Sequence, residues 1–150
     1  DIPGLIDGAH EGKGLGDRFL GHVERCRVLL HLIDPTLGPE VAVESYRTVR
    51  DELTAYGGGL DEKPEIVALS KCDAISEEDI AVCHAALAEH VDGEVRTVSA
   101  VARLNLVEIL RELRLVIRDA REAEAESEAA ATALDLPEHD EEDAVSESIS

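Results

Sequence analysis

Basic residues are scarce in this chain of 150 residues, which has 14 Lys and Arg against 34 Asp and Glu and a formal net charge of −20. Because affinity for nucleic acid rests largely on Lys and Arg that neutralise phosphates, this balance argues against free-standing binding to RNA or DNA. A local basic face is still compatible with it. Long apolar runs are missing too, since none approaches the ~18 residues that cross a bilayer, and we expect no membrane span.

Cysteine and methionine are also rare. Cys26, Cys72 and Cys83 form no C-x-x-C pair, and their spacing with the six histidines gives no plausible zinc site. We therefore predict reduced structural thiols and a cytoplasmic protein. The chain has no Met and begins directly at Asp1, so we expect it to be a fragment of a longer reading frame.

Three short apolar runs are typical of strands that helices cover on both faces, as in parallel sheets. They lie at residues 28–33, 65–69 and 94–100. Segments with helical periodicity alternate with them at residues 39–56, 76–90 and from 104 past 118, and a shorter helix is predicted at 17–25. This order predicts an α/β three-layer sandwich with a mainly parallel sheet. Doubly wound sheets usually have about five or six strands, so we expect strands on the N-terminal side to be missing.

Acidic residues gather at the end of the chain, where residues 119–150 carry twelve Asp and Glu against the single Arg121. An Ala and Glu stretch at 122–131 can extend a helix for a few turns, but the last residues have too little apolar surface to offset the entropy of ordering. We therefore divide the chain into a folded region at 1–118 and an acidic, disordered tail at 119–150.

The first four residues, Asp1, Ile2, Pro3 and Gly4, fit the pattern D-x-x-G of nucleotide-binding loops. In such a loop Asp1 would hold Mg²⁺ through water, because a carboxylate offers the hard oxygen that Mg²⁺ prefers. Gly4 would let its backbone N–H approach the terminal phosphate without a Cβ in the way. The same residues also suit a simple turn, so this pattern alone is weak.

The second strand is followed directly by Ser70, Lys71, Cys72 and Asp73, at the place where GTPases carry N-K-x-D. The carboxylate oxygens of Asp73 can accept from the ring N–H and the exocyclic amine of guanine, a donor pair that adenine lacks. Such charge-assisted bonds contribute about 1.5 to 3 kcal/mol each, so Asp73 is the predicted source of base specificity. Lys71 can lay its aliphatic stem along the base. Ser70 stands where Asn is usual, which predicts weaker affinity.

The third strand ends at Ser99 and Ala100, followed by Val101, which matches the S-A motif whose Ala amide donates to the guanine carbonyl. Two residues alone are weak evidence, and the order of the three motifs along the chain is what supports a nucleotide site. The three motifs follow one another at strand ends, where ligands bind in open α/β sheets. The sequence therefore predicts GTP and GDP as ligands and Mg²⁺ as the cofactor.

The opening stretch DIPGLIDGAHEGKGLGDRFLGHVERCRVLLHLID resembles the bacterial Obg (CgtA) family of GTPases almost throughout, with Asp7 where the family usually has Glu. The resemblance extends to about Arg118 and implies that residues 1–118 are part of a P-loop GTPase domain, from switch II to the final helix. It further implies GTP hydrolysis by a cytoplasmic switch in large-ribosomal-subunit assembly and in stress or cell-cycle control, with rRNA and ribosomal proteins as partners. We expect a monomer.

No P-loop sequence occurs in this chain, and without one nothing cradles the α- and β-phosphates, so we expect the chain alone to be inactive. Leu5 follows Gly4 where many small GTPases place a water-orienting Gln, which predicts slow hydrolysis. His10 and Glu11 are alternatives for that role, and no catalytic residue is assigned. The other interpretation of the chain is a noncatalytic, degenerate remnant of the G domain that binds the ribosome or a regulatory partner.

Overall fold

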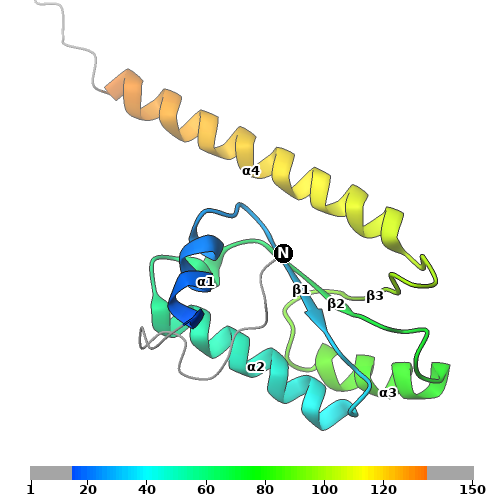
Figure 1. Cartoon of the computed structure of the whole chain (residues 1–150). Helices are drawn as coiled ribbons and strands as arrows, with labels where there is room; N and C mark the ends of the chain where they lie inside the picture. The colour runs from blue at the N-terminus through cyan, green and yellow to red at the C-terminus, as the bar shows by residue number, and fades with distance from the viewer. Residues whose placement is uncertain (1–14, 135–150) are drawn as a thin grey trace, which may run out of the picture.

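The computed structural model describes residues 15–134, and Figure 1 shows them as a sheet with helices on both sides. The elements are, in order, α1 (Leu15–Glu24), β1 (Leu29–Ile33), α2 (Pro39–Tyr56), the 3-10 helix η2 (Leu60–Glu62), β2 (Glu65–Leu69), α3 (Glu77–Ala88), β3 (Val95–Thr97) and α4 (Leu106–Leu134). Strands and helices alternate along the chain, which confirms the predicted α/β class for this region.

The three strands are parallel and lie side by side in the order β1-β2-β3. Leu29 pairs with Glu65 at the start of the β1–β2 ladder, and Val67 pairs with Val95 at the start of the β2–β3 ladder. β2 is therefore the central strand of the described sheet, and its last four residues are buried. Its continuous apolar sequence is what a strand covered on both faces requires.

Each face of the sheet is covered by its own helices, because successive side chains of a strand point to opposite faces. Val67 and Leu69 of β2 belong to a cluster with α2 and α3 that also holds Ile33, Ala42, Tyr46, Cys72, Cys83, Leu87 and Val95. Ala68 faces the other way and packs with Ile109 of α4. In Figure 1, α2 and α3 accordingly lie on one side of the strands and α4 lies on the other.

α1 is held by a separate cluster at the far end of α2. Leu20 and Val23 of α1 are buried together with Leu53 of α2 and Leu60 of η2. The short helix predicted at 17–25 is thus confirmed, with a start two residues earlier than expected.

Local signals in the sequence explain where several elements begin and end. Pro39 is the first residue of α2, where its missing N–H costs nothing. The glycines at 57–59 end that helix with φ angles of 79°, 65° and 75°, a region that residues with a Cβ avoid. Ser76 caps α3, since its Oγ accepts from the backbone N–H of Asp79 at 3.1 Å. The predicted bounds of α2 and β2 are confirmed to the residue.

The predicted end of the third strand is wrong. β3 stops at Thr97, although the apolar run continues to Ala100. The backbone N–H of Val98 still donates to the carbonyl of Leu69 at 2.8 Å, but Ser99 leaves the sheet and pairs with Leu104 in an antiparallel bridge. Residues 98–100 therefore begin a loop whose apolar composition resembles that of a strand.

α4 continues well past the predicted end of ordered structure. The expected disordered tail at 119–150 is wrong for residues 119–134, which are helical, while residues 135–150 lie outside the described part of the chain. Ala and Glu are strong helix formers, so this part of the helix needs no packing, and every residue from 121 to 134 is exposed. An ion pair from Arg27 Nε to Glu124 Oε2, 3.0 Å long, connects it to the body. The division into a domain at 1–118 and a tail stays a prediction.

The histidine in β1 and the three cysteines make contacts within the fold that are typical of structural residues. His31 Nδ1 lies 2.8 Å from Glu65 Oε1, and its ring stacks on Tyr46 with the centroids 5.4 Å apart. All three cysteines are free thiols, as predicted, and burial raises the pKa of Cys72 and Cys83. Among the helices at 15–134, none is long and apolar enough to cross a membrane.

Candidate functional site

The carboxyl ends of the three strands bring polar residues to one edge of the sheet. Asp34 directly follows β1, Ser70 directly follows β2, and Ser99 comes two residues after β3. Because the strands are parallel, these positions from three separate parts of the sequence meet at the same edge. Two of the three predicted motifs, at 70–73 and 99–101, therefore lie together there.

The loop at 70–73 is tied to the strands on both of its sides. The backbone N–H and the Oγ of Ser70 both donate to the carbonyl of Ile33, at 2.8 and 3.1 Å. The buried Cys72 donates its backbone N–H to the carbonyl of Val98 at 3.2 Å. Lys71 between them has a φ of 51°, an uncommon conformation for a residue with a side chain. The loop is thus held rigidly while the side chains of Lys71 and Asp73 stay exposed.

Ser99 connects the two motifs. Its Oγ donates to Asp73 Oδ1 in a short hydrogen bond, and it accepts from the backbone N–H of Ala102 at 3.0 Å. The second contact fixes which way the hydroxyl hydrogen points, because the Oγ has only one hydrogen to donate. Ser99 is fully buried, whereas Asp73 is exposed. Oδ2 of Asp73 has no hydrogen-bond partner among residues 15–134. One carboxylate oxygen is therefore fixed by the buried Ser99, and the other is available to a ligand.

The turn after Ser99 presents a backbone donor beside that carboxylate. Two hydrogen bonds between Ser99 and Leu104, of 3.2 and 3.0 Å, close a tight loop, and Asn105 Nδ2 fastens its base by donating to the carbonyl of Thr97 at 2.9 Å. Ala100 and Val101 lie in this turn and are exposed, with Val101 at 87%. The Ala100 amide donates to no acceptor among the described residues, so it can bind a ligand oxygen.

Asp34 is part of this edge, and the motif analysis missed it. Its Oδ2 accepts from Lys71 Nζ at 2.6 Å, and its Oδ1 accepts from the N–H and Oγ1 of Thr36 at 2.9 and 2.5 Å. The hydrogen bond from Lys71 above all, and then those from Thr36, lower the pKa of Asp34 from 3.8 to about 2. The available signal was its position, because an Asp that directly ends a strand belongs to the same edge as Ser70 and Ser99.

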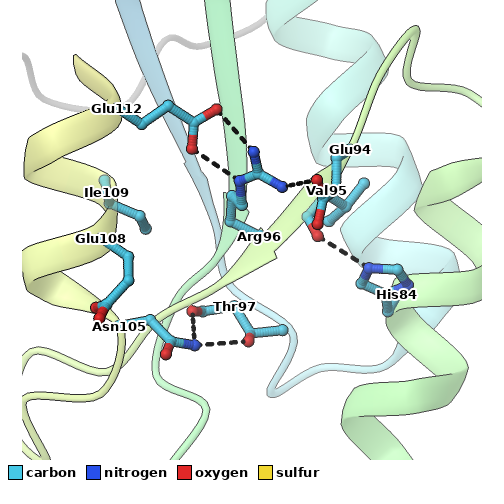
Figure 2. Close-up of a pocket in the computed structure, with 9 residues that line it drawn as sticks. All are labelled: His84, Glu94, Val95, Arg96, Thr97, Asn105, Glu108, Ile109 and Glu112. Carbon is cyan, nitrogen blue, oxygen red and sulfur yellow. Dashed lines mark hydrogen bonds and ion pairs between the residues drawn. The ribbon is translucent and has the colours of Figure 1, made fainter. Parts of the chain in front are cut away.

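A hollow of about 290 Å³ lies elsewhere, between β3 and the first turns of α4 (Figure 2). Arg96 reaches across it to Glu112, which accepts from its Nε and Nη2 at 2.8 Å each, and Glu94 pairs with the same guanidinium. These carboxylates raise the pKa of Arg96. Since two carboxylates already pair with the Arg96 guanidinium, this contact holds α4 against β3, and Arg96 is not free to bind an anionic ligand.

The phosphate side of the predicted site is not described. Asp1, Ile2, Pro3 and Gly4, and with them the predicted Mg²⁺ ligand, lie outside residues 15–134. Within that range no group of three or more His, Cys, Asp or Glu could hold a metal ion. The described edge instead combines a carboxylate, a free backbone amide and a lysine stem. This combination suits the binding of a flat polar ring that carries neighbouring donors and a carbonyl.

Comparisons with known proteins identify a family and a relative with similar sequences. The family model described as a 50S ribosome-binding GTPase matches residues 1–71. The protein GTPase Obg of Acidiphilium cryptum (strain JF-5) is 51% identical over 122 residues, which make up 81% of this chain and 36% of that relative. The chain therefore spans little more than a third of the length of this curated relative.

Proposed function

This chain belongs to the Obg family of GTPases, and from that premise we propose that the whole protein binds GTP with Mg²⁺ and hydrolyses it to GDP. The activity would act as a switch in the assembly of the large ribosomal subunit and in stress or cell-cycle control. We further propose that the described residues supply the base-binding half of the site. The chain by itself would not hydrolyse GTP, because its sequence contains no P-loop to hold the α- and β-phosphates.

The contact between Asp73 and Ser99 is the observation that carries the proposal. These residues come from two motifs that lie 26 positions apart and follow different strands, yet their side chains form a direct hydrogen bond. A strand that merely ended in a polar loop would not need a fully buried hydroxyl aimed at an exposed carboxylate. The arrangement orients Asp73 before a ligand arrives, which lowers the entropic cost of binding.

Guanine fits the groups that remain free at this edge. The Asp73 carboxylate would accept from the ring N–H and the exocyclic amine, and the Ala100 amide would donate to the guanine carbonyl. The stem of Lys71 would lie along the base, with Ser70 and Cys72 holding the loop and Val101 flanking the turn. Adenine has an amine where guanine has its carbonyl and lacks the ring N–H, so it would leave both Asp73 and Ala100 without partners.

The phosphates and Mg²⁺ would lie beyond β1. We propose that Asp1 binds Mg²⁺ through water and that the backbone of Ile2, Pro3 and Gly4 meets the terminal phosphate. β1 is an edge strand of the described sheet, and Leu30 and Leu32 on it are 38% and 53% exposed. A further strand beside β1, leading into a P-loop and its helix, would extend the sheet, and the helix would cover these side chains.

We propose rRNA and proteins of the large ribosomal subunit as partners, the cytoplasm as the compartment and a single copy as the working unit. The matching family, which is described as a 50S ribosome-binding GTPase, supports the ribosomal partner. The net charge of −20 makes a specific docking contact more plausible physically than general attraction to RNA.

A nucleotide titration of the full-length protein tests the proposal. The wild type should prefer GTP to ATP, and Asp73→Ala should weaken GTP binding by roughly 10²- to 10⁴-fold, because two charge-assisted bonds are lost. Asp92→Ala is the control, since Asp92 is an exposed acidic residue in the turn before β3. A wild type that does not distinguish GTP from ATP would refute the base site and favour the noncatalytic remnant.

A further inference from the structure

The carboxylate of Asp34 is fixed through both of its oxygens. Oδ1 accepts from the backbone N–H of Thr36 at 2.9 Å and from its Oγ1 at 2.5 Å. Oδ2 accepts from Lys71 Nζ at 2.6 Å. The Thr36 contacts close a turn of the kind that Asp and Asn side chains form with the backbone two residues on. The carboxylate of Asp34 is therefore oriented by Thr36 independently of Lys71.

In the loop at 70–73, the side chain of Lys71 extends to Asp34, the residue that follows β1. Its backbone has a φ of 51°, and the loop around it is fixed through Ser70 and Cys72, so the direction in which its Cβ leaves the chain is set. A free lysine stem has many rotamers, and fixing them costs entropy when a ligand needs one of them. The contact to Asp34 selects among these rotamers in advance.

The ion pair has little value for the fold itself. The Lys71 side chain is 63% exposed and that of Asp34 is 42% exposed, and exposed pairs of this kind contribute little stability. Asp34 is ionised at physiological pH, and its hydrogen bonds from Lys71 and Thr36 lower its pKa further, from 3.8 to about 2. The Asp34 carboxylate is thus charged, is oriented by the turn with Thr36 and is paired with Lys71. This arrangement indicates that Asp34 orients the Lys71 side chain.

We propose that Asp34 is a positioning residue for nucleotide binding, which holds Lys71 so that its aliphatic stem forms a wall for the base. This inference rests on the proposed function. The Lys71 stem contacts the face of the base and forms no hydrogen bond with the groups at its edge. Asp34, which acts through Lys71, therefore affects the affinity for purine nucleotides in general. Asp73 and Ala100 set the choice of guanine. The two roles are therefore separable by experiment.

A double-mutant cycle in the full-length protein tests the proposal, with fluorescent GTP, GDP and ATP analogues as probes. Asp34→Asn should raise the dissociation constants for all three by about tenfold, the effect of freeing one rotamer-rich side chain, and leave the GTP/ATP ratio unchanged. In a Lys71→Ala background the same substitution should have no further effect, because Asp34 acts only through Lys71. Glu124→Gln, which breaks the exposed ion pair with Arg27 far along α4, is the control and should bind as the wild type does.

Thr36→Val gives a second measurement that leaves both charges in place. It removes the Oγ1 bond to Asp34 and should raise the dissociation constants less than Asp34→Asn does, again with no effect when Lys71 is replaced. Wild-type affinity in both variants, or an equal loss with and without Lys71, would overturn the positioning role while leaving the proposed function intact. A wild-type protein that does not bind GTP would overturn the proposed function itself.

Discussion

The substitution Asp73→Asn should change the base that the site prefers, and Ser99 determines how. Ser99 Oγ donates to Oδ1 of Asp73, and its hydrogen is aimed there because Oγ also accepts from the Ala102 amide. A new Asn side chain would keep its oxygen toward Ser99, since its amide nitrogen cannot accept a hydrogen bond. The amide N–H groups would then face the ligand, where the wild-type site has the free Oδ2.

The size of the change follows from the bonds involved. Guanine would lose two charge-assisted bonds of about 1.5 to 3 kcal/mol each, which is a loss of roughly 10²- to 10⁴-fold in affinity. Xanthine carries a carbonyl in place of the exocyclic amine and would gain a neutral bond of about 0.5 to 1.5 kcal/mol, so XTP should bind better than GTP in this variant.

Competition between GTP and XTP for a fluorescent nucleotide, measured on the full-length protein, checks this prediction. Combining Ser99→Ala with Asp73→Asn should reduce the preference for XTP, because the Ser99 hydroxyl no longer orients the new side-chain amide. If Asp73→Asn keeps its preference for GTP, or if Ser99→Ala leaves the preference for XTP unchanged, the hydrogen-bond direction assigned to Ser99 is wrong.

Two further predictions concern pH and the long helix. The pKa of Asp34 is lower in the folded protein than its ordinary value of 3.8, so its carboxylate contributes stability above about pH 4 that is lost as the pH falls toward about 2. An NMR titration of the Asp34 carboxyl should give a midpoint near 2 that shifts upward when Lys71 is replaced by Ala, and a midpoint near 3.8 in the wild type would contradict the ion pair. For α4, the pair Ala125→Gly and Ala129→Gly should reduce the helical circular dichroism without moving the unfolding midpoint of the body, since each change costs about 1 kcal/mol of propensity at an exposed site. Ala129→Gln keeps a good helix former and is the matched control, and a lower midpoint in the glycine variant would mean that the exposed half of α4 supports the fold.

The sequence predicted those elements whose ends carry their own chemical signal. α2 begins at a proline and ends at three glycines. β2 is an almost continuous apolar run between Pro64 and Ser70, so both were found to the residue. The base-side residues from Ser70 to Asp73 and from Ser99 to Val101 were also found, because each motif follows a strand. The structure places them together, and their role in binding guanine stays a prediction.

The remaining features depend on contacts that a linear sequence does not display. The apolar residues 98–100 look like the rest of a strand, but the backbone of Ser99 bonds with Leu104. Val98 still donates to Leu69 of β2, and its carbonyl accepts from Cys72 in the loop at 70–73. Asp34 matches no nucleotide-binding motif; its position after β1 places it at the same edge, but its contact with Lys71 is visible only in the structure. The Ala and Glu stretch at 122–131 was expected to be able to extend the helix, yet residues 119–150 as a whole were assigned to a disordered tail because of their low apolar content. Local propensity sustains the helix to Leu134.

The length of α4 has a mechanical consequence. Its 29 residues make a rod roughly 43 Å long that starts two residues after Leu104, in the loop that carries Ala100. Its first turns are fastened to the sheet by Ile109 and by the pair of Glu112 with Arg96, so the rod turns only when the edge of the sheet turns with it. A rotation of about 5° there would carry Leu134 through roughly 4 Å. The length of α4 would therefore turn a small tilt of this edge into a displacement of several ångströms at the end of the helix.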